Sequence, residues 1–95
     1  MDDDNTIYIG KKETMSYVMA LMTQMNEGSD EGVIKARGRA ISKAVDTAEI
    51  ATRRFMDNIE ITDIVTDTEE LDNREGDGTV NVSSIKITIT KKEKE

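Results

Sequence analysis

The sequence of 95 residues has no cysteine and no histidine, and it is poor in aromatic side chains. Without cysteine there are no disulfides and no thiolate metal sites. Without histidine the chain lacks the commonest general base and the usual zinc ligand. No apolar run reaches the ~18 residues that a membrane span needs, and no signal peptide is visible. We therefore expect one soluble intracellular domain with no cofactor, no metal site and no membrane partner.

Charge is distributed unevenly along the chain. The formal net charge of -7 argues against a generic nucleic-acid-binding protein. Residues 57–79, however, contain nine acidic residues and one cation, whereas residues 32–45 contain four cations and no acidic residue. Because local potential rather than net charge steers a charged ligand, the basic stretch has to be considered by itself.

The basic stretch runs from Lys35 to Lys43 and has the pattern of a strand end, a tight turn at Gly38 and the first turn of a helix. A helix N-terminus carries about half a positive charge and unpaired N–H groups. Arg37 and Arg39 add cations at this point although cations disfavour the helix there. An anion is therefore expected, and phosphate is the usual one. The alternative is a solvated basic turn that binds nothing.

The hydrophobic pattern predicts four strands and two helices. Strands are expected at 6–9, 33–36, 59–65 and 80–90, and helices at 13–26 and 39–56. A helix between the first two strands implies that they are parallel, with a right-handed crossover. The order βαβαββ predicts an α+β, two-layer sandwich in which both helices cover one face of a four-stranded mixed sheet.

Each helix has one apolar stripe that we expect to lie in the core. The stripes are Met15, Val18, Met19, Met22 and Met25, widened by Tyr17 and Leu21, in the first helix, and Ile41, Ala44, Val45, Ala48, Ala51 and Phe55 in the second. A methionine stripe can instead form an adaptable binding groove, although core is its usual role in a chain short of aromatic residues.

The last two strands are expected to form a hairpin with a long acidic tip at 67–79. Asp72 to Gly78 lacks the D-x-D-x-D-G pattern of a calcium loop, so this segment is interpreted as solvated. In the last strand Val80 and Val82 are out of phase with the isoleucines from Ile85 onward. This indicates either a bulge at Ser83-Ser84 or a change of covering partner.

Four apolar residues of the hairpin have no obvious cover within the chain, namely Ile64, Val65, Val80 and Val82. A second copy of the chain would cover them, so a homodimer is expected. We place one domain at 6–90, with an acidic hairpin arm at 66–79. A disordered acidic tail at 1–5 precedes the domain and a frayed tail at 91–95 follows it.

Two stretches carry a family resemblance. They are Ile9-Gly10-Lys11-Lys12, followed by Met15, Tyr17 and Val18, and the run from Ile34 to Thr47, followed by Glu49-Ile50 and Arg54-Phe55. Through these residues the chain resembles, over roughly residues 5–90, the Alba family of small archaeal chromatin proteins. The resemblance implies a βαβαββ fold, similar also to the C-terminal domain of a bacterial translation initiation factor. It implies a homodimer that binds double-stranded DNA largely without sequence specificity, and RNA.

The resemblance also implies roles for individual residues. The implied nucleic-acid contacts are Lys11, Lys12, Arg37, Gly38, Arg39 and Lys43. Lys11 matches a lysine whose acetylation weakens DNA binding, so a lysine acetylase and a deacetylase are implied partners. Phe55 matches an aromatic residue that takes part in contacts between dimers arrayed on DNA. The implied location is the cytoplasm, on the chromosome.

Three features depart from the family pattern. Glu13 stands where proline is common and sets an acid beside Lys11 and Lys12. Gly32 stands where a β-branched residue is usual, which is expected to weaken the start of that strand. The arm, often basic in the family, is acidic here and would repel phosphate. The alternative function is therefore an RNA-binding, regulatory or protein-scaffold member of the fold with weakened DNA affinity.

An enzyme is a third class of function. Asp46 and Glu49 lie three residues apart on one helix, where they could share a metal ion in a nuclease. Acids on a helix surface are usually just solvated, and no histidine, cysteine or nucleophile motif supports catalysis. No catalytic residue is therefore expected.

Overall fold

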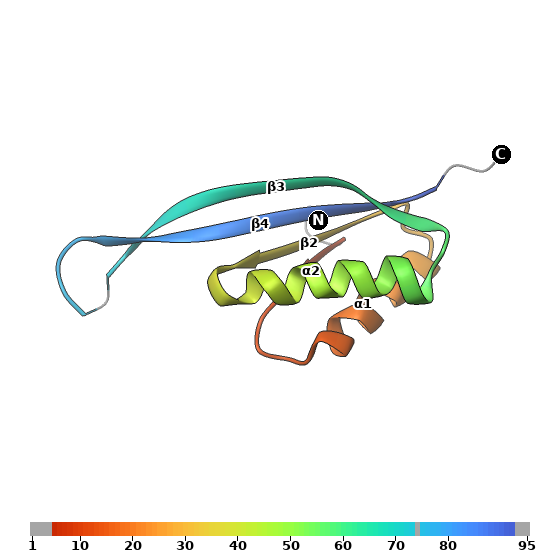
Figure 1. Ribbon diagram of the computed structural model, residues 1–95, viewed down its shortest axis with the longest axis horizontal. Helices are drawn as coiled ribbons and strands as arrows, with labels where there is room; N and C mark the ends of the chain where they lie inside the picture. The colour runs from red at the N-terminus through yellow and green to blue at the C-terminus, as the bar shows by residue number, and fades with distance from the viewer. Residues whose placement is uncertain (1–4, 74, 93–95) are drawn as a thin grey trace.

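Four strands form one mixed sheet, and two helices cover one of its faces (Figure 1). The computed structural model describes residues 5–73 and 75–92. The strands are β1 (Thr6–Tyr8), β2 (Glu31–Arg37), β3 (Ile59–Asp72) and β4 (Thr79–Lys91), arranged in the order β1-β2-β4-β3. β1 and β2 are parallel, and β4 is antiparallel to both of its neighbours. The predicted two-layer sandwich is thus confirmed.

Both helices begin and end within one residue of the expected ranges. α1 spans Thr14–Asn26 and is followed by Gly28, whose φ of 107° suits a glycine that ends a helix. The second helical segment starts as a 3-10 turn, η1 (Gly38–Ala40), continues as α2 (Ile41–Ile50) and ends as a π turn, η2 (Ala51–Phe55). In the described part of the chain no helix is both long and apolar enough to cross a membrane.

The core lies between the helices and the covered face of the sheet, and it differs from the predicted stripes. In α1 the buried side chains are Tyr17, Val18, Leu21 and Met25, whereas Met15 and Met19 are 41% and 53% exposed. The buried face is centred on Leu21, because Tyr17 is turned inward. The buried face of α1 is therefore rotated away from the predicted methionine stripe, toward Tyr17 and Leu21.

The second helical segment shows a similar difference. Val45 and Phe55 are exposed although they were expected in the core, and Thr47 is fully buried although it was not. The Thr47 hydroxyl donates a hydrogen bond of 2.8 Å to the Lys43 carbonyl, which satisfies its polar group within the helix. A pattern of apolar residues cannot predict a threonine that is buried in this way.

The hairpin is longer and more regular than predicted. β3 and β4 pair from Ile59–Lys91 to Asp72–Thr79, so the segment 67–72, expected in the tip, is strand. β-Branched residues such as Thr66 and Thr68 continue the strand through the acidic stretch. The molecule is 55 Å long and 23 Å in its other two dimensions, and the hairpin projects beyond the helices (Figure 1).

Of the two alternatives for Ser83-Ser84, a bulge or a change of covering partner, the bulge is wrong. These serines pair in register with Thr68 and Asp67, and the register shift lies in β3 between Ile61 and Asp63. Val82 is out of phase with Ile85 simply because side chains alternate between the two faces of a strand.

Asn5, Lys91 and Lys92, which were assigned to the predicted tails, are hydrogen-bonded to the domain. The Asn5 carbonyl accepts hydrogen bonds from the Val33 N–H, at 2.9 Å, and from Gln24 Nε2, at 3.0 Å. Lys91 is the last residue of β4, and the Lys92 N–H donates to the Asn58 carbonyl at 2.8 Å. The remaining residues of the predicted tails, 1–4 and 93–95, lie outside the described residues.

β2 begins at Glu31, so the strand includes Gly32. A Cβ atom at Gly32 would lie 2.9 Å from Leu21 Cδ1 and 3.2 Å from Gln24 Nε2. The missing side chain leaves room for the ends of the Leu21 and Gln24 side chains, which would have to shift if a larger residue replaced the glycine.

We predict that Gly32→Val lowers the free energy of unfolding by about 1–3 kcal/mol, because overpacking outweighs the better strand propensity of valine. Urea unfolding measures the change. Gly76→Ala is the control, since a Cβ there meets nothing within 4 Å. An unchanged urea midpoint for Gly32→Val would contradict the packing argument.

Candidate nucleic-acid interface

Two turns that carry the predicted site residues lie at the same end of the sheet. β1 and β2 are parallel, so the segment after β1 and the segment after β2 leave the sheet in the same direction. The Ile9 N–H donates to the Lys35 carbonyl at 2.9 Å and extends the pairing of the two strands. We call residues 10–12 the lysine turn and residues 37–39 the arginine turn.

Side chains from the two helices hold the lysine turn in place. The hydroxyl oxygen of Tyr17 accepts hydrogen bonds from the N–H groups of Gly10, at 2.8 Å, and Lys12, at 3.1 Å. Lys43 Nζ donates to the Gly10 carbonyl at 3.1 Å and to the Lys12 carbonyl at 2.6 Å. Since Lys43 belongs to α2, which follows the arginine turn, these bonds fix the two turns relative to each other.

Lys43 was expected to contact nucleic acid, and the structure places it between the turns. Its side chain is half-buried, and its ammonium group lies 6.0 Å from the centroid of the Tyr17 ring. An ammonium group has three donors, of which two are used on the lysine turn. Lys11 and Lys12, by contrast, are exposed.

The arginine turn depends on Gly38. Its φ of 55° lies in the left-handed region, which a residue with a Cβ atom adopts at a cost of about 1–2 kcal/mol. The predicted tight turn is therefore present. Arg37 and Arg39 on either side of it are exposed.

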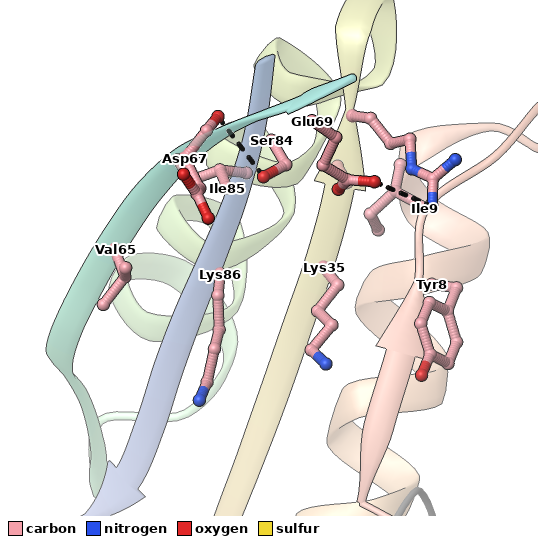
Figure 2. Close-up of a pocket in the computed structure, with 11 residues that line it drawn as sticks. Tyr8, Ile9, Lys35, Val65, Asp67, Glu69, Ser84, Ile85 and Lys86 are labelled. Carbon is pink, nitrogen blue, oxygen red and sulfur yellow. Dashed lines mark hydrogen bonds and ion pairs between the residues drawn. The ribbon is translucent and has the colours of Figure 1, made fainter. Parts of the chain in front are cut away.

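The acidic arm contacts the arginine turn, which sequence reasoning missed. Arg37 Nη2 lies 3.2 Å from Glu69 Oε1, and the two side chains are 58% and 36% exposed (Figure 2). The ion pair joins residues far apart in sequence. No sequence pattern indicated this ion pair, because β3 was expected to end at 65. One cation of the predicted site is thus partly neutralised within the chain.

Phe55 lies apart from the two turns. It is the last residue of η2, at the opposite end of the second helical segment from the arginine turn, and it is 48% exposed. The structure therefore does not bring Phe55 to the basic end of the sheet, and its expected contact between dimers stays a prediction.

Of the two acids considered for a nuclease site, Glu49 is paired with a cation. The Glu49 carboxylate accepts a hydrogen bond from Arg53 Nε, one helical turn later. Across residues 5–73 and 75–92 no group of three acidic side chains is placed to hold a metal ion.

Comparisons with known proteins agree with this geometry. A model of the family described as Alba matches residues 5–68. The chain is 52% identical over 90 residues to the DNA/RNA-binding protein Alba of Methanoculleus marisnigri, covering 95% of this chain and 97% of that one. It is 53% identical over 89 residues to the protein of the same name from Methanocella arvoryzae, covering 94% and 92%. The solved structure of Alba from Thermoplasma volcanium is similar, with a TM-score of 0.85 and 47% identity over 92% of this chain and all of that one.

We predict that Tyr17→Phe loosens the lysine turn, because two N–H groups lose their acceptor. The free energy of unfolding falls by about 1–2 kcal/mol. Amide hydrogen exchange quickens at Gly10 and Lys12 but not at Ile9, whose N–H donates to a β2 carbonyl. Equal protection of Gly10 and Lys12 in the variant and the wild type would show that Tyr17 does not hold the turn.

Proposed function

Because the chain belongs to the Alba family, we propose that it is a chromatin protein that binds double-stranded DNA, largely without sequence specificity, and RNA. The main support for the proposal is that Lys43 holds the lysine turn and the arginine turn together. Four cations, Lys11, Lys12, Arg37 and Arg39, therefore lie at one end of an otherwise acidic molecule. Relatives named DNA/RNA-binding protein support it.

The chemistry of the turns favours phosphate over bases. Lysine and arginine neutralise the nucleic-acid backbone, whereas reading adenine requires asparagine or glutamine, and neither turn contains these residues. We infer that charge supplies most of the affinity. The protein acts by binding rather than by catalysis, on the chromosome in the cytoplasm.

Acetylation would act on the same turn. Lys11 is exposed, so a lysine acetylase could reach it. Its acetylation would remove a charge together with its phosphate contact, and a deacetylase would restore both. Phe55, exposed and far from the turns, is available for contacts between dimers bound along DNA.

We propose that the protein is a homodimer. Ile64, Val65 and Val80 are 53%, 47% and 44% exposed, and all three lie on the hairpin. Val65 and Val80 face one side of the hairpin and Ile64 faces the other. Exposed apolar side chains on a projecting element support an interface, and the same surface on two copies gives a closed twofold contact. Val82, also in the predicted patch, is half-buried.

Sedimentation tests the dimer. We expect twice the chain mass at micromolar concentration, and a shift toward the monomer in Val80→Glu, because the interface would bury a charge. Met19→Glu is the control, since Met19 is 53% exposed on α1, away from the hairpin. A wild-type protein that sediments as a monomer would exclude the homodimer.

We predict that Arg37→Gln combined with Arg39→Gln weakens binding to both duplex DNA and RNA. If six phosphates are neutralised per dimer, wild-type affinity falls about a thousandfold between roughly 50 and 200 mM salt. The double variant should show a shallower salt dependence, because fewer counterions are released. Fluorescence anisotropy at several salt concentrations measures both effects. An affinity insensitive to salt and to these substitutions would favour the protein-scaffold alternative, which the Arg37–Glu69 ion pair also supports.

Removing a negative charge from the arm should have the opposite effect on duplex affinity, measured by the same fluorescence anisotropy. Glu69→Gln frees Arg37 and tightens duplex binding, by up to about fivefold, since an exposed ion pair is worth about 0–1 kcal/mol. Glu70→Gln makes the same charge change on the other face of β3 and should have the smaller effect. Equal effects would mean that the arm acts through its overall charge alone.

A further inference from the structure

The face of the sheet opposite the helices carries one row of side chains that crosses all four strands. Tyr8 pairs with Lys35, Lys35 with Lys86, and Lys86 with Val65. Figure 2 views this row with the helices behind the sheet. The row lies on the face of the sheet that the helices leave open.

A groove of about 500 Å³ follows this row. Its lining includes Tyr8, Lys35 and Lys86 on one side, and Arg37, Asp67 and Glu69 toward the arm. The Tyr8 side chain is 56% exposed, and Lys35 Nζ lies 6.0 Å from the centroid of its ring. The groove thus has an aromatic and cationic side and an acidic side.

The pairing of Lys35 with Lys86 is electrostatically unfavourable. Like charges on directly paired residues of neighbouring strands repel each other. Among the described residues the ion pairs are Arg37–Glu69 and Arg53–Glu49, and neither includes Lys35 or Lys86. An anion placed between these ammonium groups would remove the repulsion. Tyr8 lies at the end of the same row, so a flat ring could stack there while its attached anion lies on the lysines.

We propose that this groove is a second nucleic-acid site, specific for single strands, in which a base stacks on Tyr8 and the backbone phosphates bind Lys35 and Lys86. Single-strand sites combine these two features, a cationic groove and an aromatic platform. The proposal rests on the proposed function but uses other residues than the two turns.

The geometry also excludes a duplex from the groove. Bases within a duplex are stacked on each other and offer no face to Tyr8. A second phosphate backbone would lie toward Asp67 and Glu69, whose carboxylates repel it. The groove therefore accepts one backbone, on the side of β1, β2 and β4.

The test compares a fluorescein-labelled single-stranded RNA of 12 nucleotides with a labelled DNA duplex, using the full chain and fluorescence anisotropy. Tyr8→Leu keeps an apolar side chain but removes the ring, and should weaken single-strand binding about tenfold with an unchanged salt slope. Lys35→Gln with Lys86→Gln should weaken it and reduce the salt slope by about 0.7 per lost contact. Duplex affinity should stay within about twofold in both cases.

Lys92→Gln is the matched control for charge, since Lys92 is exposed and lies outside the groove. Sedimentation of each variant checks that its oligomeric state is unchanged, because Val65 borders the groove and belongs to the proposed dimer patch. The proposal is wrong if the groove variants bind single-stranded RNA as tightly as the wild type does. It is also wrong if they lose as much affinity for the duplex as for the single strand. If the groove variants bind single strands normally while the arginine-turn variant loses duplex binding, the groove alone is wrong. If the wild type binds neither probe, the proposed function fails as well.

Discussion

The arrangement of the basic end depends on how two side chains hold the backbone of residues 10–12. Tyr17 is buried, yet its hydroxyl reaches two N–H groups of the turn, and Lys43 reaches two of its carbonyls. A loop with unpaired backbone groups would otherwise be free to move, and the lysines that it carries would spread over many positions. The charge on Lys43 thus orders the lysine turn, and it also adds to the positive potential there.

The acidic character of the chain limits how far that potential extends. The net charge is -7, and eight of the 20 acidic residues lie between Ile59 and Lys91, on a hairpin that projects from the same end of the molecule as the two turns (Figure 1). The pair between Arg37 and Glu69 shows that arm and turn are in direct contact. Because both side chains are substantially exposed, the pair is weak and exchangeable. A phosphate at the proposed interface would therefore compete with an intramolecular carboxylate, which would lower the affinity without removing the site.

Much of the fold was predictable, because local patterns determine it. The change of period from strands to helices gave the order βαβαββ, and the parallel pairing of β1 and β2 followed from the helix between them. The predictions that failed are those that depend on which residues come into contact in the folded chain. The orientation of α1 depended on the inward turn of Tyr17, and Gly32 was explained only by the position of Leu21. The ion pair of Arg37 and the row from Tyr8 to Val65 required the register of β3 on β4, which no local pattern contains.

One face of the sheet forms the core and the other does not, so the two proposed sites can lie on different residues. One face is covered by helices, so its side chains are apolar and are determined by packing. The other face needs no core, so Lys35, Lys86 and Tyr8 can stand there without loss of buried area. The turns are exposed points of charge at the end of the sheet, which suits the regularly spaced phosphates of a rigid duplex. The groove is a concave surface with an aromatic ring, which suits a flexible strand whose bases are unpaired. A small sheet with one open face therefore has room for both kinds of contact on separate residues.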